Sequence, residues 1–182
     1  MYDQFRTKAE GVSAEVHRFQ TQTEAMDFIL EFMKQENVSD TPNQYAVWAQ
    51  CPFLEQADKG KVSDVNGLYF DINRERANQA RVGISQVDWA LADTGTLVQD
   101  ASAIDKRLVS TLPSIHIALL PSSAVLPDMA SWLSCVNPKN TGYISMITGP
   151  SRTADIERVL TIGVHGPERL VIVCVDELGG DN

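Results

Sequence analysis

Two short apolar runs constrain the fold of this chain more than any other feature. The run Ile115–Leu120 is apolar except for His116, and the run Leu170–Val175 is apolar throughout. A strand with apolar side chains on both faces must be covered on both faces, which is typical of a parallel sheet between helices. Helix and strand patterns alternate along the chain, so the sequence predicts an α/β fold with a largely parallel sheet flanked by helices. We expect His116 to be a core histidine bonded to a carbonyl group.

The remaining elements are predicted from periodicity and capping. Thr21 precedes Glu24 by three residues, the spacing of a capping box, and an apolar stripe then predicts a helix that ends near Lys34. We expect a leading arm at the N-terminus and a polar turn at 104–107. Strands are predicted over 14–19, 45–49, 82–85 and 143–148, a solvated helix over 73–79, a helical turn with Trp89 inward over 87–91, and a covering helix over 126–136.

Composition limits the class of protein. The chain has 182 residues and a net charge of -9, and its 15 basic residues are scattered, which argues against a nucleic-acid surface. No apolar run approaches the roughly 20 residues of a membrane span, and the N-terminus lacks the apolar core of a signal peptide. We therefore expect a cytoplasmic protein. The length suits a single domain with a sizeable core.

The cysteines do not form a metal-binding pattern. Cys51, Cys135 and Cys174 lie dozens of residues apart, without a C-x-x-C pair. No zinc or iron–sulfur site can be predicted from them. If the protein serves a redox pathway, we expect the electron carriers on other chains.

The stretch that begins at Gly149 is the stronger of two candidate sites. After a strand-like segment, a Gly-Pro turn leads to Ser151, Arg152 and Thr153, where apolar spacing up to Gly163 predicts a helix. A helix start offers free N–H groups and a positive dipole, and Arg152 offers a planar fork for phosphate or carboxylate. Alternatively, the hydroxyl side chains are only caps, and Asp155 offsets the dipole without a ligand.

Three further features could join this site. The turn Asp93–Thr96 suits either a close approach of backbone to ligand or a plain turn that uses Gly95 for its φ. Arg107 is either solvated or reaches an anion. His165 lies at the other end of the predicted helix, so it shares a pocket with Arg152 only if its loop folds back or a neighbouring subunit supplies it. Ligands in parallel sheets gather at the carboxyl ends of strands, and both stretches could open on that edge.

Four segments together resemble a known family. Ala90–Leu97, Leu112–Ile117, Gly149–Glu157 and Gly163–Pro167 are similar, in order and spacing, to the lactate utilization protein C family, whose members carry the LUD domain. The resemblance is close in the C-terminal half and general over residues 1–80. It implies a single LUD-type domain over residues 1–182, with 1–80 the less certain portion. It also implies the fold of the sugar-isomerase and CoA-transferase-like superfamily.

The resemblance implies an accessory subunit in the oxidation of L-lactate to pyruvate, acting beside iron–sulfur partner proteins. Members of the wider superfamily bind phosphosugars, CoA or related anions, so we expect a pocket for a small anion and leave any cofactor open. We identify neither a CoA-transferase glutamate nor an isomerase catalytic set. The candidate catalytic residues are Asp93, Asp155 and His165, and the candidate ligand-binding residues are Thr94, Gly95, Thr96, Arg107, Gly149, Ser151, Arg152 and Thr153.

Two other functions remain open at this point. The chain could be a free-standing enzyme on a phosphorylated or CoA-linked metabolite, with Asp93 or His165 as base and Arg152 holding the anion. It could also be a regulatory or scaffold module in which the glycine-containing motifs only shape turns.

Overall fold

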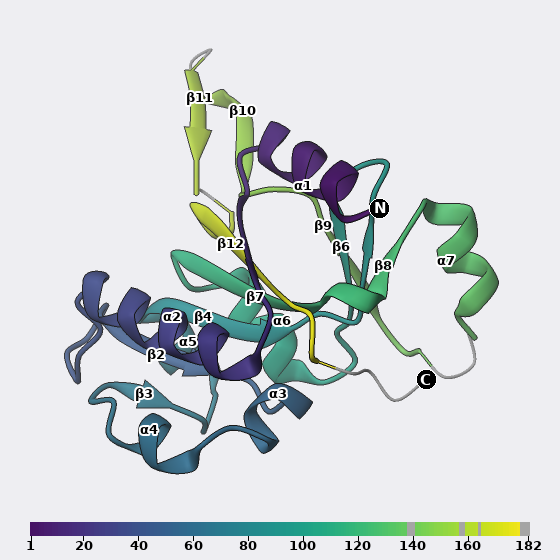
Figure 1. Cartoon of the computed structure of the whole chain (residues 1–182). Coiled ribbons are helices and arrows are strands. Elements are labelled where there is room, and N and C mark those ends of the chain that lie inside the picture. Colours follow the sequence, from purple (N-terminus) through teal and green to yellow (C-terminus); the bar gives the residue numbers. More distant parts are fainter. Residues whose placement is uncertain (138–140, 157–158, 164, 179–182) are drawn as a thin grey trace.

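A parallel sheet of six strands forms the centre of the molecule (Figure 1). The computed structural model describes residues 1–137, 141–156, 159–163 and 165–178. Every neighbouring pair in the sheet is parallel, so the predicted α/β fold with a parallel sheet is confirmed. The strand order is β1 (Glu15–Phe19), β12 (Arg169–Val175), β7 (Ile115–Pro121), β4 (Ala80–Gln86), β2 (Tyr45–Trp48) and β3 (Leu68–Tyr69).

Helices cover one face of this sheet and a mixed layer covers the other. Alternate residues of β12 pack into different cores: Val171 and Val173 face the side of α2, whereas Ile172 and Cys174 face the side of α1. Every residue of β7 is buried, as expected for a strand with both faces covered. The first face carries α2 (Gln22–Gln35), α3 (Pro52–Glu55) and α4 (Lys59–Ser63), and the second carries α1 (Tyr2–Gly11), α5 (Arg74–Asn78) and α6 (Ile104–Thr111).

A second, four-stranded sheet packs beside α1. Its order is β8 (Val125–Leu126), β5 (Trp89–Leu91), β6 (Thr96–Asp100) and β9 (Ile144–Ile147), and a short 3-10 helix η1 (Ser122–Ala124) leads into β8. Helix α7 (Met129–Cys135) covers the face away from α1, where Trp132 and Trp89 meet edge to face at 6.2 Å. The helical turn predicted for 87–91 is wrong, because this segment extends to pair with both β6 and β8.

The helix predicted after Arg152 is also wrong. This segment forms an antiparallel hairpin of β10 (Arg152–Ile156) and β11 (Val159–Ile162), which projects beyond α1 (Figure 1). Ile156 and Val159 are cross-strand partners. Their spacing of three residues imitates one face of a helix, but β-branched residues dominate the segment and favour strands. Glu157 lies outside the described residues.

The other elements follow the predictions with smaller differences. Thr21 and Glu24 form the capping box of α2, as predicted. The expected leading arm is α1, and the expected polar turn at 104–107 is the first turn of α6. The covering helix begins only at Met129, because the carbonyl oxygens of Leu126 and Pro127 still accept backbone N–H groups of the neighbouring strand segment, and Asp128 then caps the helix by accepting the N–H of Ser131.

Candidate functional site

Both predicted motifs meet at the C-terminal end of α1. Gly95 has a φ of 72°, and a Cβ placed on it would lie 2.4 Å from the backbone nitrogen of Ala9. Gly149 has a φ of 74°, and its Cβ would lie 2.4 Å from the carbonyl oxygen of Val12. Only glycine tolerates both conditions. The backbone that approaches these glycines is therefore that of α1 and of Val12, the residue that directly follows it.

Hydroxyl and guanidinium groups reinforce this junction. The Oγ1 atoms of Thr96 and Thr148 lie 2.9 Å apart and join β6 to the segment that follows β9. Arg152 donates from Nη2 to the carbonyl oxygen of Val12 at 2.8 Å and to the Ser13 hydroxyl. Arg152 thus ties the β10–β11 hairpin to the connection between α1 and β1.

The loop around His165 lies at the amino end of the parallel sheet. The N–H of Ser151 donates to the carbonyl oxygen of Pro167 at 2.8 Å, and the N–H of Glu168 donates to that of Ser114 at 2.7 Å. Ser114 immediately precedes β7 and Glu168 immediately precedes β12. The stretch 149–168 therefore opens on the edge opposite the carboxyl edge considered from the sequence.

The remaining predicted residues occupy different environments. Asp93, Thr94 and His165 are exposed, and Thr153 and Asp155 lie on β10 rather than in the first turn of a helix. Arg107 lies at the other end of β6, where its Nη1 donates to the carbonyl oxygen of Ala101 at 2.6 Å. The fold brings Thr94–Thr96 together with Gly149–Arg152, and it places Arg107 elsewhere.

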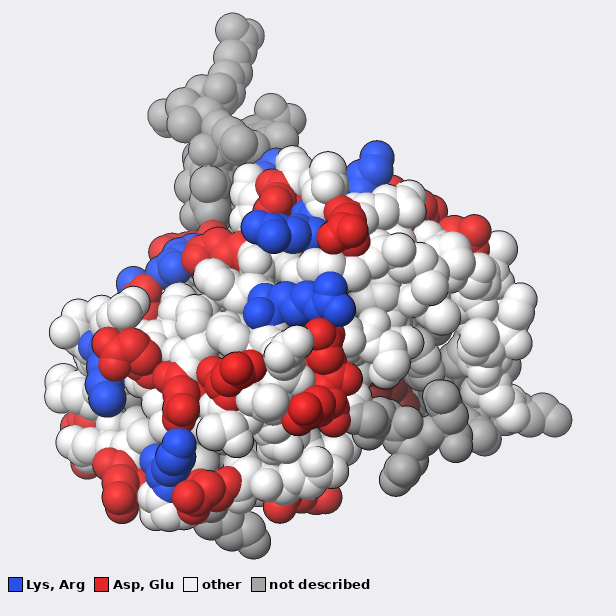
Figure 2. All heavy atoms as spheres, viewed as in Figure 1, with Lys and Arg blue, Asp and Glu red and all other residues white. Residues whose placement is uncertain are grey.

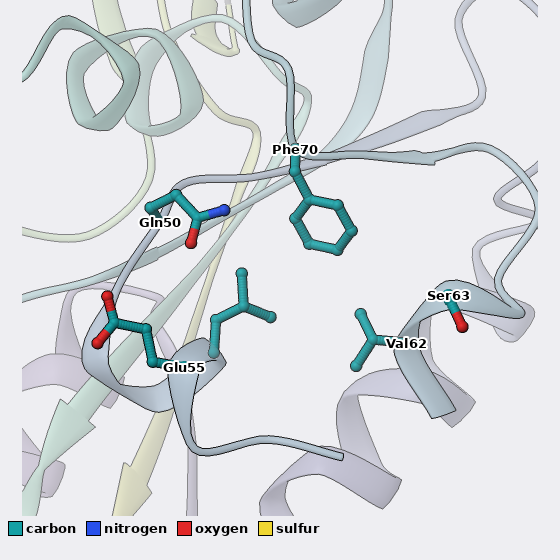
Figure 3. Close-up of a pocket in the computed structure, with 6 residues that line it drawn as sticks. Gln50, Glu55, Val62, Ser63 and Phe70 are labelled. Carbon is teal, nitrogen blue, oxygen red and sulfur yellow. The ribbon is translucent and has the colours of Figure 1, made fainter. Parts of the chain in front are cut away.

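A pocket of about 330 Å³ opens at the carboxyl ends of β2 and β3 (Figure 3). The sequence predicts no site in this region, because the walls of the pocket come from different short segments. The sequence feature that could have revealed the pocket is a set of apolar residues within an otherwise polar stretch. The lining consists of Gln50, Leu54, Glu55, Val62, Ser63 and Phe70, none of which was predicted as a site residue.

A buried polar cluster joins the two sheets. Gln99 of β6 donates from Nε2 to Ser85 Oγ of β4 at 2.8 Å, and that hydroxyl lies 2.9 Å from Nε2 of His116. His116 thus bonds to a hydroxyl rather than to the expected carbonyl group. Its Nδ1 has no partner within the described part of the chain. Burial lowers the pKa of His116 to about 4, so the neutral ring is the stable form.

The comparisons with known proteins identify the family. The family model for the LUD domain matches residues 2–175. The chain belongs to the LUD domain family. Its fold is similar to that in a crystal structure of a DUF162 family protein from Deinococcus radiodurans, with a TM-score of 0.67 over 96% of this chain and 95% of that one. The two sequences are 14% identical, so this likeness concerns the fold alone.

Curated relatives of this LUD domain are named Lactate utilization protein C. The relative from Bacillus licheniformis is 36% identical over 123 residues, which cover 64% of this chain and 51% of the relative. The relative from Bacillus subtilis is 40% identical over 111 residues, 58% of this chain and 46% of the relative. The chain thus spans about half the length of the curated relatives it matches.

The described part of the chain contains neither a candidate membrane-spanning helix nor a candidate metal-binding cluster. Among the described residues, no helix has the length and apolarity needed to cross a membrane. Those residues also contain no group of three or more His, Cys, Asp and Glu side chains arranged to hold a metal ion. On the face shown in Figure 2, basic and acidic side chains are interspersed.

Proposed function

We propose that this LUD domain takes part in lactate utilization, as an accessory component of the oxidation of L-lactate to pyruvate in the cytoplasm. The observation that supports the proposal is the identity of 36–40% to several proteins named Lactate utilization protein C. These alignments cover about half of each relative, so the proposal concerns the contribution of this domain. We also propose that residues 1–182 act as one unit, related to the sugar-isomerase and CoA-transferase-like superfamily.

In this proposal, electrons pass to iron–sulfur proteins rather than to a centre on this chain. Cys51 and Cys174 are buried, and desolvation raises the pKa of both thiols, that of Cys174 to about 12. Iron–sulfur clusters are held by thiolates, so thiols that stay protonated are poor ligands. The third cysteine, Cys135, is exposed and lies in α7.

In this proposal, a small anion would bind to this domain near the C-terminal end of α1. Among the described residues of the stretch 149–168, Arg152 and His165 have exposed, nitrogen-bearing side chains. Arg152 already donates two hydrogen bonds to the connection between α1 and β1, so an anion would share its guanidinium with those acceptors. We therefore propose that the main role of the motif is to hold the junction at the end of α1 together. Binding of a carboxylate or phosphate there would be a lesser role.

Co-purification from the native host tests the proposed role. The tagged chain is isolated from cells grown on L-lactate and from cells grown on glucose, and bound proteins are examined by visible absorption and mass spectrometry. We expect iron–sulfur proteins to accompany the chain in lactate-grown cells. Isolation of the chain without such proteins from lactate-grown cells, under conditions that preserve lactate oxidation in the extract, would contradict the proposal.

A further inference from the structure

The pocket described above lies where ligands gather in α/β sheets. Strand β3 pairs with one side of β2 at the edge of the sheet, and the next strand, β4, returns to the other side of β2. The chain reverses its direction across the sheet at this point. The adjacent strands whose connections leave in opposite directions are β2 and β4, and ligands in open parallel sheets bind at the carboxyl ends of strands beside such a switch point. Gln50 follows β2 by two residues and Phe70 directly follows β3, so both lie on this edge.

The pocket has an apolar interior and a polar rim. Leu54 and Val62 are buried, and the half-buried ring of Phe70 points into the space between α3 and α4 (Figure 3). Gln50 and Glu55 lie together on the side opposite α4, and both are exposed. This arrangement offers a flat aromatic surface inside and hydrogen-bonding groups at one side of the opening.

The two rim groups determine which ligand fits. Within the described residues, the side chains of Gln50 and Glu55 form neither a hydrogen bond nor an ion pair. A glutamine amide presents a donor beside an acceptor, which matches a ring edge with an acceptor nitrogen beside an amino group. The carboxylate of Glu55 only accepts hydrogen bonds, and its negative charge disfavours an anion at this opening.

We propose that this pocket binds a planar nitrogen heterocycle with an amino group beside a ring nitrogen, of the 6-aminopurine type. Phe70 stacks on the ring, Leu54 and Val62 enclose it, and Gln50 and Glu55 bind its amino edge. A volume of about 330 Å³ is at the lower end of the range of ligand pockets, which suits a single ring system. The inference goes beyond lactate utilization and does not depend on it.

Calorimetric titration with adenosine tests the inference. We expect saturable binding of adenosine and at least about tenfold weaker binding of purine riboside, which lacks only the exocyclic amino group, because one charge-assisted hydrogen bond is lost. Glu55→Gln should weaken adenosine binding about tenfold, and Phe70→Leu should weaken it about three- to tenfold through loss of ring stacking. The exposed substitution Glu31→Gln on α2 is the matched control and should leave binding unchanged.

The inference is overturned if adenosine produces no binding heat at millimolar concentration, or if purine riboside binds equally well. It is also overturned if Glu55→Gln and Phe70→Leu both bind adenosine as the wild type does, since the ligand would then bind elsewhere. Glu55 is exposed, so its substitution should fold normally even if the Phe70 variant does not. Thermal unfolding of each variant verifies its folding before titration.

Discussion

The surroundings of His116 keep its imidazole ring neutral. Its side chain is fully buried, and burial lowers its pKa from 6.5 to about 4. Between these values the unfolded chain binds the proton more tightly than the folded one, so the free energy of unfolding falls as pH falls from about 6.5 to about 4. At 1.36 kcal/mol per pKa unit the loss is about 3 kcal/mol. Urea unfolding measured at several pH values in this range checks the prediction.

A pair of histidine substitutions isolates this contribution. His116→Gln keeps a polar group for the hydroxyl of Ser85 but does not titrate, so the loss of stability in acid should shrink. His165→Gln replaces an exposed histidine and is the matched control for the substitution itself. An identical pH slope in His116→Gln and in the wild type would show that another group causes the acid sensitivity.

Glycines at the α1 junction give a second prediction at the residue scale. Gly95→Ala and Gly149→Ala should each lower the free energy of unfolding by at least about 2 kcal/mol, because the new Cβ needs a positive φ and meets the backbone of α1. Gly11→Ala, near which no atom lies within 4 Å of the added Cβ, is the control and should be neutral or stabilising by up to about 1 kcal/mol. Denaturant unfolding compares the three, and equal effects would contradict the account.

At the scale of elements, Arg169 links three of them. It donates to Glu15 of β1 at 2.7 Å and to Glu36 after α2, and Arg81 of β4 also donates to Glu36. Burial opposes ionisation of Glu36, but the hydrogen bonds from both arginines outweigh it and lower its pKa. Arg169→Met should therefore cost about 1–2 kcal/mol of stability, a figure reduced for its partial exposure.

Arg6→Met is the matched control for Arg169. Arg6 pairs with Glu10 on the exposed side of α1, where solvent screens the charges, so its loss should lower stability much less than the loss of Arg169. Thermal unfolding at low and high salt measures both variants. Equal losses would mean that the ion pairs around Arg169 contribute no more than an ordinary surface pair.

The attachment of the β10–β11 hairpin predicts a coupling between two distant residues. Arg152 and Ser13 are 139 positions apart and are joined by a hydrogen bond. In a double-mutant cycle, Arg152→Ala and Ser13→Ala should show a coupling energy of about 0.5–1 kcal/mol. The cycle cancels the effect of alanine at the positive φ of Ser13. Additive effects in urea unfolding would mean that Arg152 is not anchored there.

Strongly patterned elements could be predicted from the sequence, and weakly patterned ones could not. The strands β7 and β12 carry continuous apolar runs, and helix α2 carries a capping box. Each of these patterns indicates only one type of element. Helix α6 begins without a side-chain cap, so its start carries no signal. The residues that surround a glycine in a turn likewise do not reveal whether the glycine faces a ligand or another helix or strand. At Gly95 and Gly149 the answer depends on α1, which is remote in the sequence.

At the scale of the whole molecule, the two notable regions lie on opposite edges of the parallel sheet. The motif at 149–168 is at the amino edge and the pocket is at the carboxyl edge. The pocket could not be predicted because Gln50, Leu54, Val62 and Phe70 come together only after three segments fold. The sequence did predict the sheet that creates both edges. Because the two regions are separate, we expect a substitution in the pocket to change ligand binding and to leave the α1 junction intact. A substitution at the junction should do the reverse.

L-Lactate consumption by cells with and without this chain tests the central claim most directly. The gene is deleted in its own host, and growth and lactate disappearance are measured with L-lactate or with pyruvate as the carbon source. We predict that the deletion abolishes or strongly slows the use of L-lactate, leaves the use of pyruvate unchanged, and is reversed by the wild-type gene. Unchanged consumption of L-lactate in the deletion strain would contradict a role of this LUD domain in lactate utilization.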